Sequence, residues 1–170
     1  MQLAAAAELI LALESAAKST GAIDTVGTVG ICDVFPGAVN SVPSRVVITT
    51  DVRDIDRARR DSVLAALAAA TEEVSARRGV TITTELINAD PPTTCDPAIL
   101  AALEASAIAA GKTYKKMVAR AYHDSSFVSV IAPVAMLFIP LPRRSQPPAR
   151  RVRIAGVDRQ WRTRAVADIG

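Results

Sequence analysis

Hydrophobic and polar positions along the chain change their period several times, and each change marks a predicted element. Between residues 2 and 20 apolar residues recur at helical spacing, and Gly21 is a natural end for that helix. Two stretches that are alternating or rich in β-branched residues, 24–35 and 45–53, predict strands. The later elements are a helix capped by Asp54 or Asp56 and ending near Arg78, a strand at 80–87, a helix from Asp96 to Gly111, a strand at 117–121, a helix at 123–131 and a strand at 134–139.

The first five elements follow the order helix, strand, strand, helix, strand. This is a ferredoxin-like β-α-β-β-α-β unit that lacks its first strand, so the expected fold class is α+β. In the usual strand order, 4-1-3-2, the missing strand is central. Without it, the strand at 80–87 either pairs in parallel with the strand at 45–53, or the chain associates or misfolds. Met1 is then expected to be a start inside a longer reading frame.

The stretch 36–54, PGAVNSVPSRVVITTDVRD, joins two of these strands and carries candidate chemistry at its ends. Asn40 lies in the predicted loop and Arg53 ends the predicted strand. An amide and a guanidinium fork are a pair suited to holding a carboxylate. On these residues alone, the alternative is that Asn40 caps a turn and Arg53 is a solvated strand end.

Three motifs follow one another along the chain. The first is G-x-x-N-x-V-P followed by D-x-R, which ends at Arg53. The second is RAYHDS at 120–125, and the third is an apolar strand that ends F-x-P at Met136–Pro140. In this order the motifs resemble the zinc-dependent amidohydrolases of the hydantoinase/carbamoylase type, which belong to the aminoacylase/carboxypeptidase superfamily and have S-G-A-G-H-D-A in place of the second motif. The resemblance covers about residues 1–140.

This resemblance implies roles for three residues. In the family, the residues matched by Asn40 and Arg53 sit on a smaller lid domain and hold the substrate carboxylate. The residue matched by His123 lies near the metals and polarises the amide or ureido group. Tyr122 stands where the family has glycine and narrows the space beside that site. For this chain we favour the alternative, a lone histidine at a helix start with Asp124 as a local partner.

The resemblance also implies a domain organisation. Residues 1–90 would form the incomplete lid, which also mediates dimerisation in the family. Residues 91–140 would form a partial α/β piece of the catalytic domain, and residues 141–170 an irregular, disordered basic tail. The implied substrate is an N-carbamoyl-L-amino acid or an allantoate-like ureido acid, hydrolysed at a linear C–N bond.

The zinc chemistry of the family is not expected in this chain. Family members bind two zinc ions through His, Asp and Glu side chains, most of them upstream of the lid, as is the catalytic Glu. This chain contains one His, whereas a two-metal site needs about three or more ligands per metal. We therefore expect no bound zinc, no other cofactor and no activity from the chain by itself.

The basic tail has a separate explanation. Residues 141–170 hold eight Arg and two acidic residues, whereas the rest of the chain holds twelve basic and fifteen acidic residues. Codons chosen within their degeneracy for this tail, read one base out of step, encode GVSHRPDE, which is the family's next motif, G-x-S-H-x-P-x-E. Our hypothesis is a one-base frameshift near residue 141, so that the arginines follow from codon composition. Salt-sensitive nucleic-acid binding through the tail is the less favoured alternative.

Composition adds only broad limits. Two cysteines, Cys32 and Cys95, are too few for a disulfide framework, so a reduced, cytoplasmic setting is expected. No uninterrupted apolar run approaches the length of a membrane span, so no membrane partner is expected. The partners expected are a small ureido acid and a second copy of the lid. The alternative function is a non-catalytic dimerisation module that pairs with an intact paralogue.

Overall fold

The computed structural model describes residues 2–139, 152–155 and 161–168. The chain divides into two compact units: unit 1 is Met1–Pro91 with Gln160–Gly170, and unit 2 is Pro92–Arg159. Each unit has a sheet of its own, and helices and strands are mixed in both, as expected for an α+β chain. Within the described ranges, no helix is both long enough and apolar enough to cross a membrane.

The two long helices of unit 1 begin and end where their end signals predict. Helix α1 is Gln2–Ser19 and helix α2 is Arg57–Arg78. Of the two candidate caps, Asp56 is the one that caps α2: its Oδ1 accepts a hydrogen bond from the backbone N–H of Arg59 at 3.0 Å. Gly79 follows α2 with a φ of +60°, a left-handed conformation that glycine adopts without a steric penalty.

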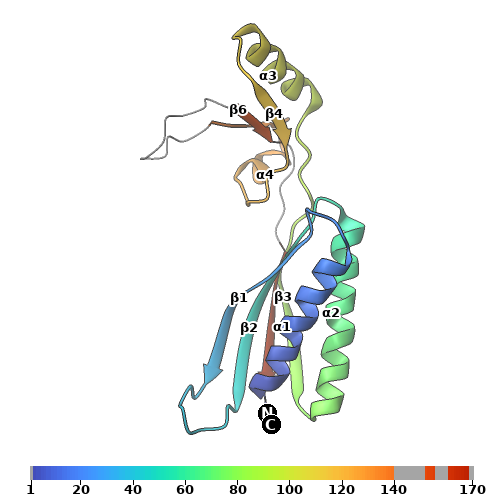
Figure 1. Ribbon diagram of the computed structural model, residues 1–170, viewed down its shortest axis with the longest axis vertical. Helices are drawn as coiled ribbons and strands as arrows, with labels where there is room; N and C mark the ends of the chain where they lie inside the picture. Colours follow the sequence, from blue (N-terminus) through green and yellow to red (C-terminus); the bar gives the residue numbers. More distant parts are fainter. Residues whose placement is uncertain (1, 140–151, 156–160, 169–170) are drawn as a thin grey trace. The chain divides into compact units, whose positions relative to one another are not determined.

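Unit 1 contains a four-stranded antiparallel sheet. Its strands are β1 (Val26–Phe35), β2 (Arg45–Arg53), β3 (Thr81–Ala89) and β7 (Trp161–Asp168), in the order β1-β2-β7-β3. β1 and β2 form a hairpin in which Val26 lies opposite Arg53 and Phe35 lies opposite Arg45. Helices α1 and α2 lie side by side on the sheet, as Figure 1 shows.

Strand β7 fills the position that the sequence left empty. In ferredoxin-like numbering β1, β2 and β3 are the second, third and fourth strands, and β7 lies between the third and the fourth, where the first belongs. Ala165 of β7 lies opposite both Ile48 of β2 and Thr84 of β3. The backbone groups that β2 and β3 would otherwise leave unpaired thereby gain partners. The gap is closed by the C-terminal segment, and not by parallel pairing of β3 with β2.

The expectation of a disordered tail therefore does not hold for all of residues 141–170. β7 and a second strand, β6 (Val152–Ala155), lie in this range. The other tail residues lie outside the described part of the chain, so the expectation stays a prediction for them.

The core of unit 1 lies between the helices and the sheet. β2 contributes alternate residues to it, so that Val46, Ile48 and Val52 are each at most 3% exposed. The intervening residues of β2, among them Asp51 and Arg53, lie on the opposite face of the strand. The core residues form two clusters: Ala5, Ala6, Leu9, Val46, Ile48, Val74 and Val80 in one, and Leu13, Val52 and Val63 in the other.

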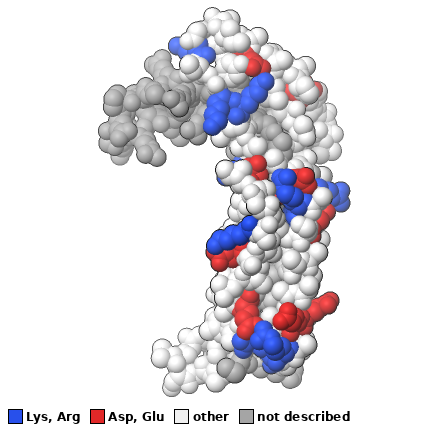
Figure 2. All heavy atoms as spheres, turned by 45° about the vertical axis from the view of Figure 1, so that its right-hand side comes forward, with Lys and Arg blue, Asp and Glu red and all other residues white. Residues whose placement is uncertain are grey.

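Glu8 joins the two helices at the end of α2. Its carboxylate accepts hydrogen bonds from both Arg78 and Arg77, and the Nε of Arg78 lies 3.0 Å from its Oε1. These hydrogen bonds lower the pKa of Glu8 from 4.5 to about 2, and the hydrogen bond from Arg78 has the largest effect. On the face drawn in Figure 2, other acidic side chains also lie next to basic ones.

Unit 2 is smaller, and fewer of its described residues are buried. It contains α3 (Pro97–Ala109), β4 (Tyr114–Met117), α4 (Ser125–Val128) and β5 (Met136–Phe138), with β6 lying between β4 and β5. β6 is parallel to β4 and antiparallel to β5.

Two predictions for unit 2 were wrong in the bounds of the element. The strand predicted at 117–121 ends at Met117, because only Tyr114–Met117 has a pairing partner in β6, and the helix predicted at 123–131 is a single turn.

Candidate functional site

Arg53 is the last residue of β2, and a neighbouring carboxylate holds its guanidinium. The Nε of Arg53 donates to Oδ2 of Asp51 at 2.8 Å, and its Nη2 donates to the same oxygen at 2.5 Å. Two residues apart on a strand, both side chains lie on one face, the face away from the core. The side chains of Arg53 and Asp51 are 25% and 19% exposed. The fork is thus partly sheltered and oriented, which argues against a freely solvated strand end.

Asn40 lies in the loop of the β1–β2 hairpin and is exposed. The backbone N–H of Ser44 donates to the carbonyl of Phe35 at 2.9 Å and closes this loop. Gly37 takes a φ of +71°, where a side chain would be strained and its Cβ would also crowd the carbonyl of Val34. Asn40 contributes to the wall of a shallow hollow of about 630 Å³ between this loop and the start of α1. The loop therefore presents an amide to solvent beside a concave surface.

The structure does not bring Asn40 and Arg53 together within one chain. Arg53 lies at the Val26 end of the hairpin, whereas Asn40 lies in the loop beyond the Phe35 end. The ends of β2 are about 26 Å apart at the usual rise of about 3.3 Å per residue. One carboxylate therefore cannot contact both residues in a single copy. Their assigned roles stay predictions.

His123 lies in unit 2, just before α4. Its ring packs against Phe138 of β5, with centroids 5.6 Å apart and planes at 61°, and its carbonyl accepts a hydrogen bond from the N–H of Ser126 at 3.0 Å. Tyr122 packs against Phe127 at 5.4 Å. The histidine is half-buried against aromatic neighbours. Its polarising role is untested by this geometry.

The residues present do not fit the metal pair of the family. Within residues 2–139, 152–155 and 161–168, no three His, Cys, Asp or Glu side chains lie close enough together to hold a metal ion. The whole chain has one His.

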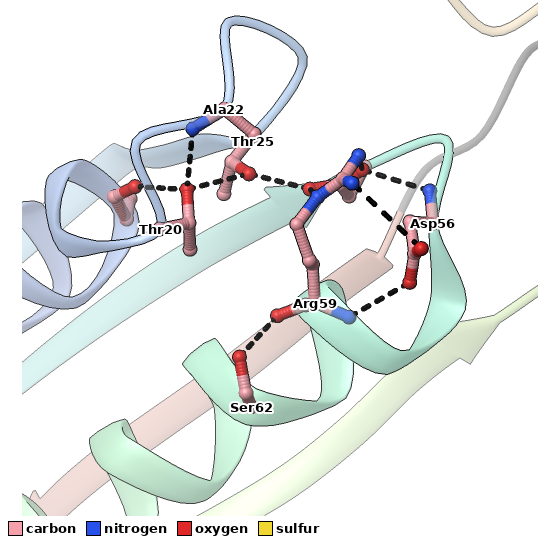
Figure 3. A network of polar contacts seen from close by, with 8 residues as sticks. Thr20, Ala22, Thr25, Asp56, Arg59 and Ser62 are labelled. Atoms are coloured by element: carbon pink, nitrogen blue, oxygen red, sulfur yellow. Dashed lines mark hydrogen bonds and ion pairs between the residues drawn. The ribbon is translucent and has the colours of Figure 1, made fainter.

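Asp54 follows Arg53 directly, and its carboxylate is buried. The sequence predicted this residue only as a possible helix cap, but its hydrogen bonds fix the end of β2. Oδ1 of Asp54 accepts from the backbone N–H of Asp56 at 2.8 Å and from Nη2 of Arg59 at 2.6 Å. Its Oδ2 accepts from Nε of Arg59 at 3.0 Å and from the Thr25 hydroxyl. The Thr20 hydroxyl donates to that of Thr25 at 2.9 Å, which extends the network to the end of α1 (Figure 3). The signal that could have found this network is the Asp that directly follows D-x-R.

We expect Asp54→Asn to lower the free energy of unfolding by about 2 kcal/mol at pH 7, since it leaves buried donors poorly paired. Burial raises the pKa of Asp54, but hydrogen bonds from Arg59, Thr25 and the Asp56 N–H outweigh it, so the pKa lies below its ordinary 3.8. A carboxyl group whose pKa is lower in the folded chain than in the unfolded chain stabilises the fold at any pH above its pKa in the unfolded chain. This stabilisation is lost as the pH falls through the pKa of the group in the folded chain. The cost should thus shrink below pH 3.8.

Urea unfolding at pH 7 and at pH 3 measures this difference. Asp56→Asn is the matched control, because it also removes a carboxylate near Arg59 but Asn caps a helix as well as Asp does. A cost of Asp54→Asn that is equal at both pH values would contradict the prediction.

Comparisons with known proteins agree with the resemblance in the sequence. No family model matches the chain. Over 137 residues it is 47% identical to a ureidoglycolate hydrolase of Oryza sativa subsp. japonica. The aligned residues make up 80% of this chain and 28% of that protein. It is 35% identical over 137 residues to an N-carbamoyl-L-amino acid amidohydrolase of Geobacillus stearothermophilus. The aligned residues make up 81% of this chain and 33% of that protein.

Solved structures give the same result. AtUAH in complex with glyoxylate matches 89% of this chain and 32% of its own, with a TM-score of 0.74 and 35% identity. A hydantoinase/carbamoylase family amidase from Burkholderia vietnamiensis matches 90% of this chain and 33% of its own, with a TM-score of 0.75 and 25% identity. The chain described here is therefore a homologue of the proteins of the hydantoinase/carbamoylase family. It spans about a third of the length of the curated relatives that it matches.

Proposed function

We propose that this chain is the carboxylate-holding, dimer-forming part of a zinc-dependent amidohydrolase that cleaves linear C–N bonds in ureido acids. The relatives named ureidoglycolate hydrolase, N-carbamoyl-L-amino acid amidohydrolase and allantoate deiminase support this substrate class. The metals and the catalytic carboxylate would come from residues outside this chain, so the 170-residue chain alone has no hydrolase activity. Zinc-dependent turnover by the purified chain would contradict this.

The observation that carries the proposal is the placement of Asn40 and Arg53 at opposite ends of an edge hairpin. In the order β1-β2-β7-β3, β1 is an edge strand and its outer backbone groups face away from β2. An edge strand of ten residues is a template for pairing with a second chain. If two copies of β1 pair antiparallel about a two-fold axis, the Phe35 end of one copy meets the Val26 end of the other.

This pairing would place the loop of one copy beside Arg53 of the other. Arg53 is one strand inward from β1, so about two strand spacings, or roughly 10 Å, separate its backbone from the partner strand. An extended guanidinium, a ligand carboxylate and the loop amide of Asn40 can together span that distance. The carboxylate site would then belong to the dimer, with Arg53 from one copy and Asn40 from its partner.

Mixing two defective chains tests this arrangement. N-carbamoyl-L-alanine binding is followed by NMR line broadening for the wild-type chain, for Asn40→Ala, for Arg53→Ala and for an equal mixture of the two variants. Each variant alone should lose binding. In the mixture about half of the dimers are mixed and each restores one of its two sites, so about a quarter of the sites should recover by random pairing. A mixture that binds no better than the variants would refute the shared site.

The exposed β1 edge also supports a second candidate function. The chain could act as a non-catalytic module whose β1 pairs with the corresponding edge of an intact paralogue. Affinity capture with the wild-type chain and with Val29→Pro, which places a proline in β1, separates the two cases. Recovery of an intact family member with the wild-type chain alone favours the module.

A further inference from the structure

A cavity of about 420 Å³ lies in unit 1 between α2 and the sheet. Leu64 and Leu67 of α2 line one side of it, and residues of β2 and β3 line the other. β2 and β3 are not neighbours in the sheet, because β7 runs between them. A cavity that is lined by both of these strands therefore lies over the position of β7.

The register of the sheet relates this cavity to the sequence of β7. Four of the residues that line the cavity lie directly opposite two residues of β7, Thr163 and Ala165. The four are Thr50 and Leu86, opposite Thr163, and Ile48 and Thr84, opposite Ala165. Protein interiors keep few voids larger than a water molecule, and strands usually bring large aliphatic residues to the core. β7 has threonine and alanine at these two positions, so its sequence supplies little volume where the cavity lies.

β7 can leave its position without interrupting the rest of unit 1. The other elements of unit 1 follow one another within Met1–Pro91, and residues 92–159 separate β7 from them. Without β7, the inner edges of β2 and β3 would present unpaired N–H and C=O groups to an antiparallel strand. A strand of another protein can make the same backbone hydrogen bonds. Since β7 is tethered and has a high effective concentration, only a strand whose side chains fit better displaces it.

We propose that the slot between β2 and β3 is a strand-binding site. It takes a β-strand of a second protein, in exchange for β7, when that strand carries large aliphatic residues at the positions of Thr163 and Ala165. Such residues would fill the cavity and cover Leu86, which is 55% exposed although it lines the cavity. The site uses neither Asn40 nor Arg53 and is independent of the proposed carboxylate site.

Two peptides that differ at two positions test this exchange on the full chain. One peptide has the sequence of residues 161–168, and the other carries Thr163→Ile and Ala165→Ile. Isothermal titration should show that the substituted peptide binds more tightly by about tenfold or more, because it buries additional aliphatic carbon atoms. Hydrogen exchange of the labelled chain, followed by NMR, should show that the amides of β7 lose protection in the complex while those of β2 and β3 keep it.

A variant of the chain provides an independent readout. Ala165→Leu supplies a large aliphatic residue at the same position of β7, so it should raise Tm and weaken binding of the substituted peptide. Ala66→Leu, at an exposed position of α2, is the control and should change neither quantity.

Three results would overturn the inference. If the two peptides bind equally well, the aliphatic residues do not reach the cavity. If the substituted peptide binds while the amides of β7 stay protected, it pairs with an edge of the sheet and not with the slot. If benzene shifts the resonances of Leu64 and Leu67 but neither peptide binds, the cavity is a site for small apolar molecules.

Discussion

Ala165→Pro is expected to unfold unit 1 or to lower its free energy of unfolding by at least about 3 kcal/mol. Ala165 lies opposite Ile48 on one side and Thr84 on the other, so β7 is bonded along both edges. Proline has no N–H to donate, and a strand with two neighbours has no solvent-facing edge on which that loss is harmless. A domain of this size is stable by only about 5–15 kcal/mol.

Urea unfolding followed by circular dichroism measures the effect. Ala165→Val is the matched control, because it changes the side chain but keeps the N–H and has a high strand propensity. The valine variant should unfold near the wild-type midpoint. If the proline variant also keeps the wild-type midpoint, β7 does not hold the central position in solution.

Leu13→Ala is expected to cost about 3 kcal/mol, because a leucine that is 1% exposed leaves a cavity when it is truncated. Leu13 is in the smaller core cluster with Val52 and Val63, where α1 meets β2 and α2. It also covers Gly27 of β1. A Cβ built on Gly27 would lie 3.1 Å from Cδ1 of Leu13 and 3.1 Å from Cβ of Ala17.

A double-mutant cycle makes this prediction specific. Gly27→Ala alone should cost about 1–3 kcal/mol through overpacking. In the Leu13→Ala background the same change should cost less, because the leucine contact has gone and only that with Ala17 remains. Leu11→Ala, on the exposed side of α1 at 63% exposure, is the control and should change stability little. Additive costs at Leu13 and Gly27 would contradict the packing seen here.

Most of the local structure of unit 1 could be predicted from the sequence, because end signals and hydrophobic period agree there. β2 has the predicted bounds, Asp56 caps the start of α2, and Gly79 ends α2 in the left-handed conformation. The predictions fail where pairing over long sequence distances decides the structure. β7 was missed because an arginine-rich tail carries no clear strand signal, and its place depends on the vacancy between β2 and β3.

The candidate site shows the same limit. Asn40 was predicted in a loop and Arg53 at a strand end, and both are there. Their separation in space was not foreseen, since thirteen residues of sequence suggest proximity, whereas the extended strand between them keeps them apart. The link between Arg53 and Asp51 is local, two residues along one strand, and was within reach of the sequence.

Unit 1 is discontinuous along the chain, and this affects the order in which a ribosome can supply its parts. The ribosome delivers α1 through β3 first, then residues 92–159 of unit 2, and only then β7. At about 5–20 residues per second, β2 and β3 wait roughly 3–14 s for the strand that belongs between them. During that interval their unpaired edges can capture strands of other nascent chains. The yield of folded protein should therefore depend on how quickly the codons for residues 92–159 are translated.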